Sequence, residues 1–162
     1  MIIIDGGTTT LAMAPFLANR QVRIITNSIL IAHQLFKERD QAKGAEVYLT
    51  GGMLFPDSGL LVGPQTEENI RQFNADLGFI SVGGIDNGIA TNTDQLVVAN
   101  ERAIIQQSRK IIMLADHSKF GVKDMCRICS LPDIDLLITD NDPSVSPHLN
   151  KLSGPKPDFV LV

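Results

Sequence analysis

The stretch Ile2-Ile3-Ile4-Asp5-Gly6-Gly7-Thr8-Thr9-Thr10 joins a continuous apolar run to a polar, glycine-rich turn. Continuous apolar runs are typical of strands buried on both faces, as in a parallel sheet covered by helices. A helical pattern follows over Thr8–Ala18, and Pro15 inside it predicts a kink or a helix of only two turns. The stretch therefore predicts a strand–turn–helix unit, which is the building block of an α/β fold.

The same unit repeats along the chain, because apolar runs alternate with helical patterns. We expect helices in five segments, with Asn92 or Thr93 capping the fourth: Thr8–Ala18, Ser28–Glu38 (buried through Ile29, Ala32, Leu35 and Phe36), Pro64–Phe73, Gln95–Ser108 and Pro147–Leu152. The segment Met53–Gly63 reads as a loop with a short strand at Gly59–Val62. The pattern predicts one three-layer α/β domain over residues 1–162, with a mainly parallel sheet built from seven runs: Ile2–Ile4, Val22–Ile25, Val47–Leu49, Leu77–Val82, Ile111–Ala115, Ile134–Ile138 and Phe159–Val162.

Glycines and polar side chains follow the first five of these runs. In open parallel sheets, ligands bind in the crevice at the carboxyl ends of the strands, so we predict a ligand site there. The alternative is that such turns need glycines and capping residues without any ligand. The candidate ligand-binding residues are Asp5, Gly6, Gly7, Thr8, Thr9 and Thr10, then Thr26, Asn27 and Ser28, then Gly51 and Gly52, then Gly83 and Gly84, and finally Asp116, Ser118 and Lys119.

The Gly6–Thr10 turn has the chemistry of a phosphate-binding loop. Its glycines let backbone N–H groups face an anion, its threonines add hydroxyl donors, and a helix start adds partial positive charge. It matches neither a Walker loop nor the dinucleotide fingerprint. Lys119 is the only cation at the five exits, so we expect it to hold a ligand phosphate together with this turn, while Asp5 and Asp116 face sugar hydroxyls.

Composition excludes several classes of protein. A net charge of −4 predicts weak binding of this chain to DNA, because duplex binding depends on Lys and Arg. The sequence predicts neither a membrane segment nor a secretory signal, and its two cysteines suit the cytoplasm. Cys126 and Cys129 lack two further zinc ligands, and in a strand over Met125–Ser130 they would point to opposite faces. We therefore expect no metal, no cofactor and no catalytic residue.

Together these motifs resemble the effector-binding domain of DeoR-type bacterial transcriptional regulators. The resemblance is carried by Asp5–Thr10, Thr26–Ser28, Gly51-Gly52, Gly83-Gly84-Ile85 and Leu114–Phe120, and it extends over nearly the whole chain. It implies the fold of ribose-5-phosphate isomerase, glucosamine-6-phosphate deaminase and the CoA transferases, a sugar phosphate or related effector, and a homo-oligomer. It also implies DNA binding through an N-terminal helix-turn-helix domain that this sequence lacks. Glu101 and Arg102 join the candidate site through this resemblance, although a helical Glu faces solvent by default.

Two classes of function are open from the sequence, besides a domain that serves oligomerisation alone. The first is a sensing domain, part of a repressor of sugar metabolism, whose ligand shifts a conformational equilibrium. The second is a sugar-phosphate isomerase or deaminase on the same fold, which would need a general base. The nearest counterpart to the isomerases' Asp-Gly-Ala-Asp element is Gly84-Ile85-Asp86-Asn87-Gly88. We favour the sensing domain.

Overall fold

A computed structural model of the protein describes residues 1–40, 43–150 and 156–162. Its helices are α1 (Thr8–Leu11), α2 (Ala14–Leu17), α3 (Ile29–Glu38), α4 (Pro64–Arg71), α5 (Gln95–Gln107) and α6 (Val145–Asn150), with 3₁₀ turns η1 (His117–Lys119) and η2 (Leu131–Asp133). Its strands are β1 (Ile2–Ile4), β2 (Arg23–Thr26), β3 (Glu46–Leu49), β4 (Met53–Phe55), β5 (Leu60–Val62), β6 (Leu77–Ile80), β7 (Gly84–Asp86), β8 (Ile89–Asn92), β9 (Ile111–Leu114), β10 (Cys126–Ser130), β11 (Leu136–Thr139) and β12 (Asp158–Leu161).

The main sheet contains, within the described residues, the seven strands that the apolar runs predict, in the order β12-β11-β9-β6-β1-β2-β3. Every neighbouring pair in it is parallel. From β1 the chain moves to one edge through β2 and β3, and from β6 it moves to the other edge. The order therefore reverses between β1 and β6, which is where open α/β sheets bind ligands.

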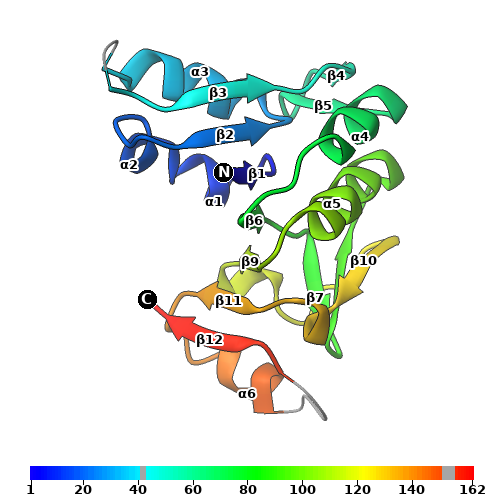
Figure 1. Cartoon of the computed structure of the whole chain (residues 1–162). Coiled ribbons are helices and arrows are strands. Elements are labelled where there is room, and N and C mark those ends of the chain that lie inside the picture. The colour runs from blue at the N-terminus through cyan, green and yellow to red at the C-terminus, as the bar shows by residue number, and fades with distance from the viewer. Residues whose placement is uncertain (41–42, 151–155) are drawn as a thin grey trace.

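Helices cover both faces of this sheet, as expected for three layers (Figure 1). Successive side chains of a strand point to opposite faces. Ile2, Ile4 and Ile24 pack with α2 and α3 in one core cluster, which also contains Ile31 and Leu35. Ile3 and Ile25 belong to the other cluster, with residues of α4 and α5. The predicted three-layer α/β fold is confirmed.

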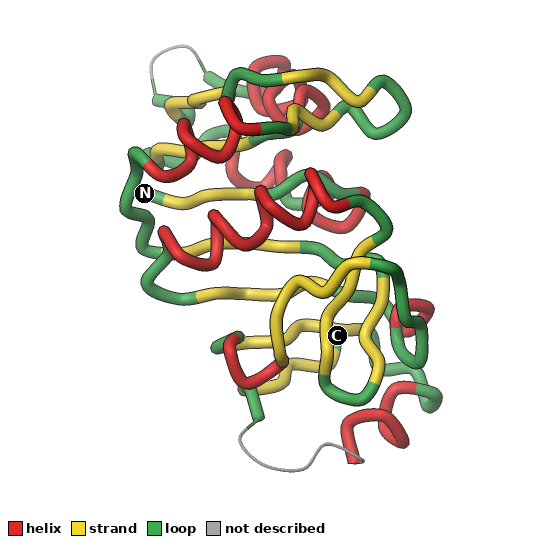
Figure 2. Tube along the Cα trace, turned by 90° about the vertical axis from the view of Figure 1, so that its right-hand side faces the viewer, coloured by secondary structure: helices red, strands yellow, loops and turns green. Residues whose placement is uncertain are grey.

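Two smaller sheets lie beside the main one. β7, β8 and β10 form an antiparallel sheet whose strands cross those of the main sheet steeply (Figure 2). β4 and β5 form an antiparallel hairpin where we expected a loop with a strand at Gly59–Val62. Their apolar runs are too short to separate from loop sequence, so the strands depend on tertiary pairing.

The helices differ from the expected ones in three details. The pattern over Thr8–Ala18 is two one-turn helices, and Pro15 lies in the first turn of α2, where its missing N–H is tolerated. Asp94, rather than Asn92 or Thr93, caps α5 by accepting hydrogen bonds from the N–H groups of Leu96 (2.7 Å) and Val97 (3.3 Å). The expected helix at Pro147–Leu152 is α6 and begins earlier, at Val145, and its end at Leu152 lies outside the described residues.

The buried face of α3 also differs from the expected one. Ile31 and Leu35 are fully buried, whereas Phe36 is 74% exposed. The helical spacing was therefore right and Leu35 is buried as expected, but the buried face is turned toward Ile31 and away from Phe36. The pattern alone offered two apolar stripes on this helix, and packing against β2 and β3 selected one of them.

Twist spreads the strand ends apart across the sheet. Each step between neighbouring strands turns by roughly 20–25°, and the turns accumulate. The two edge strands β3 and β12 consequently point in opposite directions in Figure 1 although every pair is parallel. Only the carboxyl ends near the centre, those of β2, β1, β6 and β9, therefore lie close enough to build one site.

Candidate functional site

The Gly6–Thr10 turn leaves β1 at the centre of the sheet and is fixed by the turn after β2. The N–H of Gly6 donates a hydrogen bond to Asn27 Oδ1 at 3.1 Å. A Cβ atom on Gly6 would lie 2.0 Å from Leu60 Cδ2, so only glycine permits this close approach. The first two strand exits and the β4–β5 hairpin thus meet at one point.

A cavity of about 330 Å³ opens beside this turn. Its walls are formed by predicted site residues and by the β4–β5 hairpin, through Asp57 and Ser58. The sequence did not indicate these two residues, because no local pattern places the hairpin next to the β1 exit. Its lining residues are Gly6, Gly7, Thr8, Leu11, Ser28, Leu30, Asp57, Ser58 and Leu60.

Several hydroxyl groups predicted to bind ligand stabilise the backbone instead. Thr10 Oγ1 donates to the carbonyl oxygen of Gly7 (3.0 Å), Thr26 Oγ1 accepts from the N–H of Ser28 (3.1 Å), and Ser28 Oγ caps α3 by accepting from the N–H of Ile31 (3.3 Å). The helix after the turn has a single turn, so it adds little dipole charge. The turn's capacity for an anion therefore lies mainly in its backbone N–H groups and in Thr8, whose side chain is exposed.

A buried polar cluster lies on the α5 side of the β1 exit. Asp5 is 1% exposed and Glu101 0%, which corrects the solvent-facing default for Glu101. Asn92 Nδ2, from β8, donates to Glu101 Oε1 at 2.8 Å. Among the described residues, Asp5 Oδ1, Asn27 Nδ2, Asn100 Oδ1 and Glu101 Oε2 are buried without a hydrogen-bond partner. Such atoms are rare in folded proteins, so their concentration here makes this cluster a candidate for ligand binding.

Burial raises the pKa values of both carboxyls. The pKa of Asp5 rises to about 7, because loss of solvent disfavours the charged form more than the nearby Asn27 amide and Gly6 N–H favour it. The pKa of Glu101 lies well above its ordinary value, first because of burial and second because of the neighbouring charge of Asp5. The Asn92 amide and Arg102 act in the opposite direction on Glu101.

Asn100, which sequence reasoning missed, ties α5 to the site. Its Nδ2 donates to the carbonyl oxygen of Leu61 (2.9 Å), and the N–H of Leu61 donates to the carbonyl oxygen of Asn27 (2.7 Å). Since Asn27 also accepts from Gly6, hydrogen bonds run from α5 through β5 and the β2 exit to the turn. The only sequence signal for Asn100 was its place on the apolar stripe of the helix.

The β9 exit forms a separate, well-fixed turn. Asp116 caps η1 by accepting from the N–H of Ser118 (2.9 Å), and the Ser118 side chain, followed by this N–H and by Lys119, lowers the pKa of Asp116. His117 pairs through Nδ1 with Asp140, at the end of β11, and the pair raises the pKa of His117. Lys119 ends the turn, two strands away from β1, which corresponds to roughly 10 Å at ~4.8 Å per strand. Its flexible four-carbon stem suits it to reach across this distance.

The remaining candidates lie away from the cavity. Gly51 and Gly52 pack against α4, where Thr66 Oγ1 donates to the Gly51 carbonyl oxygen (2.6 Å). Gly83 and Gly84 pack against residues 122–124. Arg102 is exposed and donates to the backbone carbonyls of β10, so it anchors α5 rather than entering the cavity.

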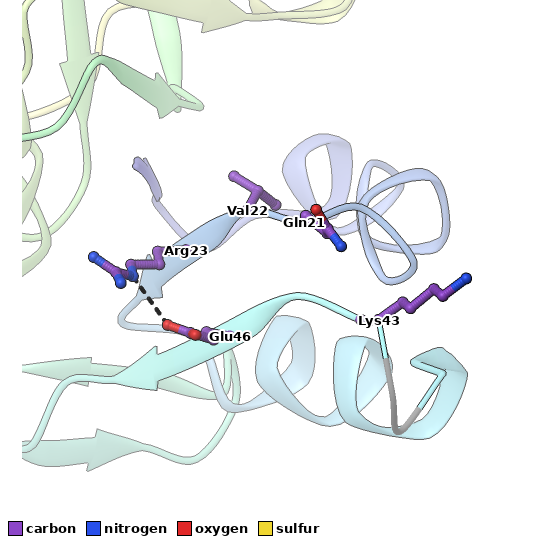
Figure 3. Close-up of a pocket in the computed structure, with 6 residues that line it drawn as sticks. Gln21, Val22, Arg23, Lys43 and Glu46 are labelled. Carbon is purple, nitrogen blue, oxygen red and sulfur yellow. Dashed lines mark hydrogen bonds and ion pairs between the residues drawn. The ribbon is translucent and has the colours of Figure 1, made fainter.

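A second hollow, of about 320 Å³, lies at the opposite edge of the sheet, where β2 and β3 begin (Figure 3). The Arg23 Nε–Glu46 Oε2 ion pair spans it at 3.0 Å, and both side chains are about 60% exposed. Lys43 points away from this pair (Figure 3). Exposed ion pairs contribute little, and the strand carboxyl ends are distant, so we assign no site here.

The two cysteines face the same core, contrary to the expected alternation. A β-bulge between Arg127 and Cys129 removes the period of two, so Cys126 packs against the cluster that contains Cys129. Among residues 1–40, 43–150 and 156–162, no group of three or more His, Cys, Asp or Glu side chains is placed to hold a metal ion. No helix in the described part of the chain has the length and apolar character needed to cross a membrane.

Comparison with known proteins gives the family. A family model described as the DeoR C terminal sensor domain matches residues 1–141. The glycerol-3-phosphate regulon repressor of Escherichia coli (strain K12) is 37% identical over 147 residues, which cover 90% of this chain and 57% of that protein. The HTH-type transcriptional repressor GlcR of Bacillus subtilis (strain 168) is 38% identical over 146 residues, with 88% and 54% covered.

A glycerol-3-phosphate regulon repressor of Haemophilus influenzae is 35% identical over 162 residues, with 99% of this chain and 61% of that protein covered. The chain thus spans between half and two thirds of the length of these curated relatives. Their names are those of repressors rather than of enzymes, which supports the sensing class over the enzyme. The match over residues 1–141 confirms the predicted resemblance: the chain belongs to the family of DeoR C terminal sensor domains.

Proposed function

We propose that this domain binds a phosphorylated sugar or related metabolite at the carboxyl ends of β1, β2 and β9, and that it senses this effector for a DNA-binding repressor. The observation that carries the proposal is the cavity of about 330 Å³ beside the Gly6–Thr10 turn, where the exits of the central strands β1 and β2 meet the β4–β5 hairpin. Relatives named for the glycerol-3-phosphate regulon support a phosphorylated effector.

The charges of the site divide it into two ends. The backbone N–H groups of the turn and Lys119 suit the phosphate, which carries close to two negative charges at neutral pH. The buried polar cluster with Asp5 and Asn27, and Asp57 on the hairpin, suit sugar hydroxyls, because carboxylates accept hydrogen bonds only. An elongated phosphorylated polyol or sugar satisfies both ends.

DNA binding, oligomerisation and location belong to the same proposal. A net charge of −4 disfavours direct binding of this domain to DNA, and the curated relatives are longer than this chain. We therefore assign DNA contact to a helix-turn-helix domain of a longer regulator, which acts as a homo-oligomer in the cytoplasm.

No specific observation favours the isomerase or deaminase. The Gly84–Gly88 element forms the β7–β8 hairpin, where Asn87 Nδ2 donates to Asp86 Oδ2 at 3.0 Å. Asp86 lines a different, smaller cavity of about 60 Å³ rather than the one beside the β1 turn. Sustained conversion of ribose 5-phosphate or glucosamine 6-phosphate by the purified domain would contradict the sensing function.

Titration calorimetry with glycerol 3-phosphate, glucose 6-phosphate and ribose 5-phosphate tests the proposal, with glycerol, glucose and ribose as controls. We expect binding of at least one ester and of none of the unphosphorylated compounds. Lys119→Ala should weaken that binding by roughly 10- to 100-fold, the equivalent of one charge-assisted hydrogen bond. Lys110→Ala is the matched control, because Lys110 precedes β9 and Lys119 follows it. Equal effects of the two substitutions would remove Lys119 from the site.

A further inference from the structure

Two buried carboxyls face the boundary between the main sheet and α5. Ile3 packs in the core cluster that contains α5 residues, and Asp5 lies two positions further along the same strand direction. The side chain of Asp5 therefore belongs to the same face. Glu101 lies on the buried side of α5, next in register to Val97 and Val98. The two groups interact electrostatically across this boundary.

One oxygen of each carboxyl has no hydrogen-bond partner. These atoms are Asp5 Oδ1 and Glu101 Oε2, and both are shielded from solvent. Two ionised carboxylates cannot satisfy one another, because both are acceptors only. A single proton between them converts one carboxyl into a donor and leaves the other as its acceptor. It also reduces the buried charge from two to one.

Within the described part of the chain, no buried Lys or Arg surrounds the pair and could take the proton's place. From the β2 exit the pair meets the Asn27 amide, and from β8 the Asn92 amide. From β10 the thiol of Cys129 interacts with Glu101, and burial raises the pKa of that thiol to about 12, so it is neutral. Arg102 is the cation that acts on Glu101, and its guanidinium is exposed and bound to β10 carbonyls.

We propose that Asp5 and Glu101 share one proton, and that this carboxyl–carboxylate pair fastens the β1 exit to α5 and makes effector binding take up protons. The first half concerns the domain alone. The second half rests on the proposed function, because it assumes that an anionic effector binds at the turn that follows Asp5. A dianionic phosphate brought close to the pair raises its affinity for protons.

The unfolding equilibrium tests the shared proton without any ligand. The pair holds one proton in the folded chain and almost none in the unfolded chain above about pH 5, so the folded state binds more protons. The stabilisation by the shared proton is complete below the unfolded pKa values and is lost as the pH rises through the folded pKa values, which are raised to about 7 for Asp5 and well above the ordinary value for Glu101. We therefore compare how the unfolding constant rises between pH 5 and pH 7. For each pH unit, the factor of increase should be about ten times larger for the wild type than for Glu101→Gln.

Urea titrations of the full chain at pH 5, 6, 7 and 8 measure this difference. Glu68→Gln is the matched control, since Glu68 is an exposed helical glutamate on neighbouring α4, and it should keep the wild-type slope. His117 adds a slope of the same sign, but it is unchanged in all these variants. Because one proton is shared, Asp5→Asn, Glu101→Gln and the double variant should show the same reduced slope. Additive losses in the double variant, or a wild-type slope in Glu101→Gln, would overturn the proposal.

Calorimetric titration of glycerol 3-phosphate at pH 8, in two buffers of different ionisation enthalpy, tests the link to the effector. At this pH the phosphate is already a dianion, so its own titration does not contribute. We expect net proton uptake for the wild type and Glu68→Gln and none for Glu101→Gln. Binding without uptake in the wild type would overturn the link. If glycerol 3-phosphate, glucose 6-phosphate and ribose 5-phosphate all fail to bind, the proposed function fails, and the unfolding experiment still decides on the shared proton.

Discussion

Asn27→Ala should destabilise the domain and thereby show that the β1 turn depends on a buried side chain from the neighbouring strand exit. Asn27 is 1% exposed, and its Oδ1 accepts the hydrogen bond of the Gly6 N–H at 3.1 Å. Alanine leaves this N–H buried and unpaired, which costs about 1–3 kcal/mol. The loss of the partnerless Nδ2 offsets part of this cost, and the small cavity left behind adds to it.

A change of this size is easy to measure. For a domain of 150–250 residues, 1 kcal/mol shifts the melting temperature by roughly 2–4 °C, so Asn27→Ala should melt roughly 2–12 °C below the wild type. Urea unfolding at pH 7 should give the free energy directly, with an unchanged slope in urea.

Asn19→Ala provides the control for this prediction. The Oδ1 of Asn19 also accepts from a backbone N–H 21 residues away, that of Asp40 at 2.6 Å, but Asn19 is exposed. Water can replace an exposed acceptor, so this substitution should change the unfolding free energy by less than about 0.5 kcal/mol. Equal losses in both variants, or a loss below about 0.5 kcal/mol in Asn27→Ala, would refute the argument that burial of the Gly6 hydrogen bond fixes the turn.

Two further predictions follow from local geometry. Gly52→Ala should destabilise the domain more than Gly63→Ala in urea titrations. Both glycines have positive φ (132° and 99°), so both substitutions strain the backbone. At Gly52 the added Cβ would also lie 2.0 Å from Thr66 Oγ1, whereas at Gly63 no described atom lies within 4 Å of it. The NMR titration of His117 should give a pKa above 6.5 that falls in Asp140→Asn, because the Asp140 carboxylate favours the charged imidazole. Any stability that this pair adds is present at low pH and is lost as the pH rises through the raised pKa of His117. An unchanged His117 titration in Asp140→Asn would contradict the pairing.

The seven strands of the main sheet could be predicted from the sequence because each is a short, continuous apolar run. A strand buried on both faces needs apolar side chains at every position, and this property is local. The polar exits could be predicted for the same reason: Asp5 and Asp116 directly follow such a run, and Asn27 follows one after Thr26. That they lie at one edge follows once all strands are parallel.

Three of the antiparallel strands, β4, β7 and β8, could not be predicted in this way. They are three or four residues long, and β7 and β8 contain Gly, Asp or Asn beside the apolar residues. The β10 bulge changed which side chains face the core, and alternation along a strand cannot anticipate an inserted residue. Pairing with neighbouring strands decided these elements, within a hairpin for β4 and β7 and with the distant β10 for β8.

The fold class, the family resemblance and the order of the polar exits could all be established from patterns within a few residues of the sequence. The role of each polar group, in contrast, depended on how the chain packs. Thr10 and Thr26 turned inward to backbone partners, and Glu101 and Asn100 became buried opposite β1 and β5, nearly a hundred and about forty residues away. The physical reason is that a polar side chain takes its role from the groups that surround it after burial, and those groups come from parts of the chain that only packing brings together.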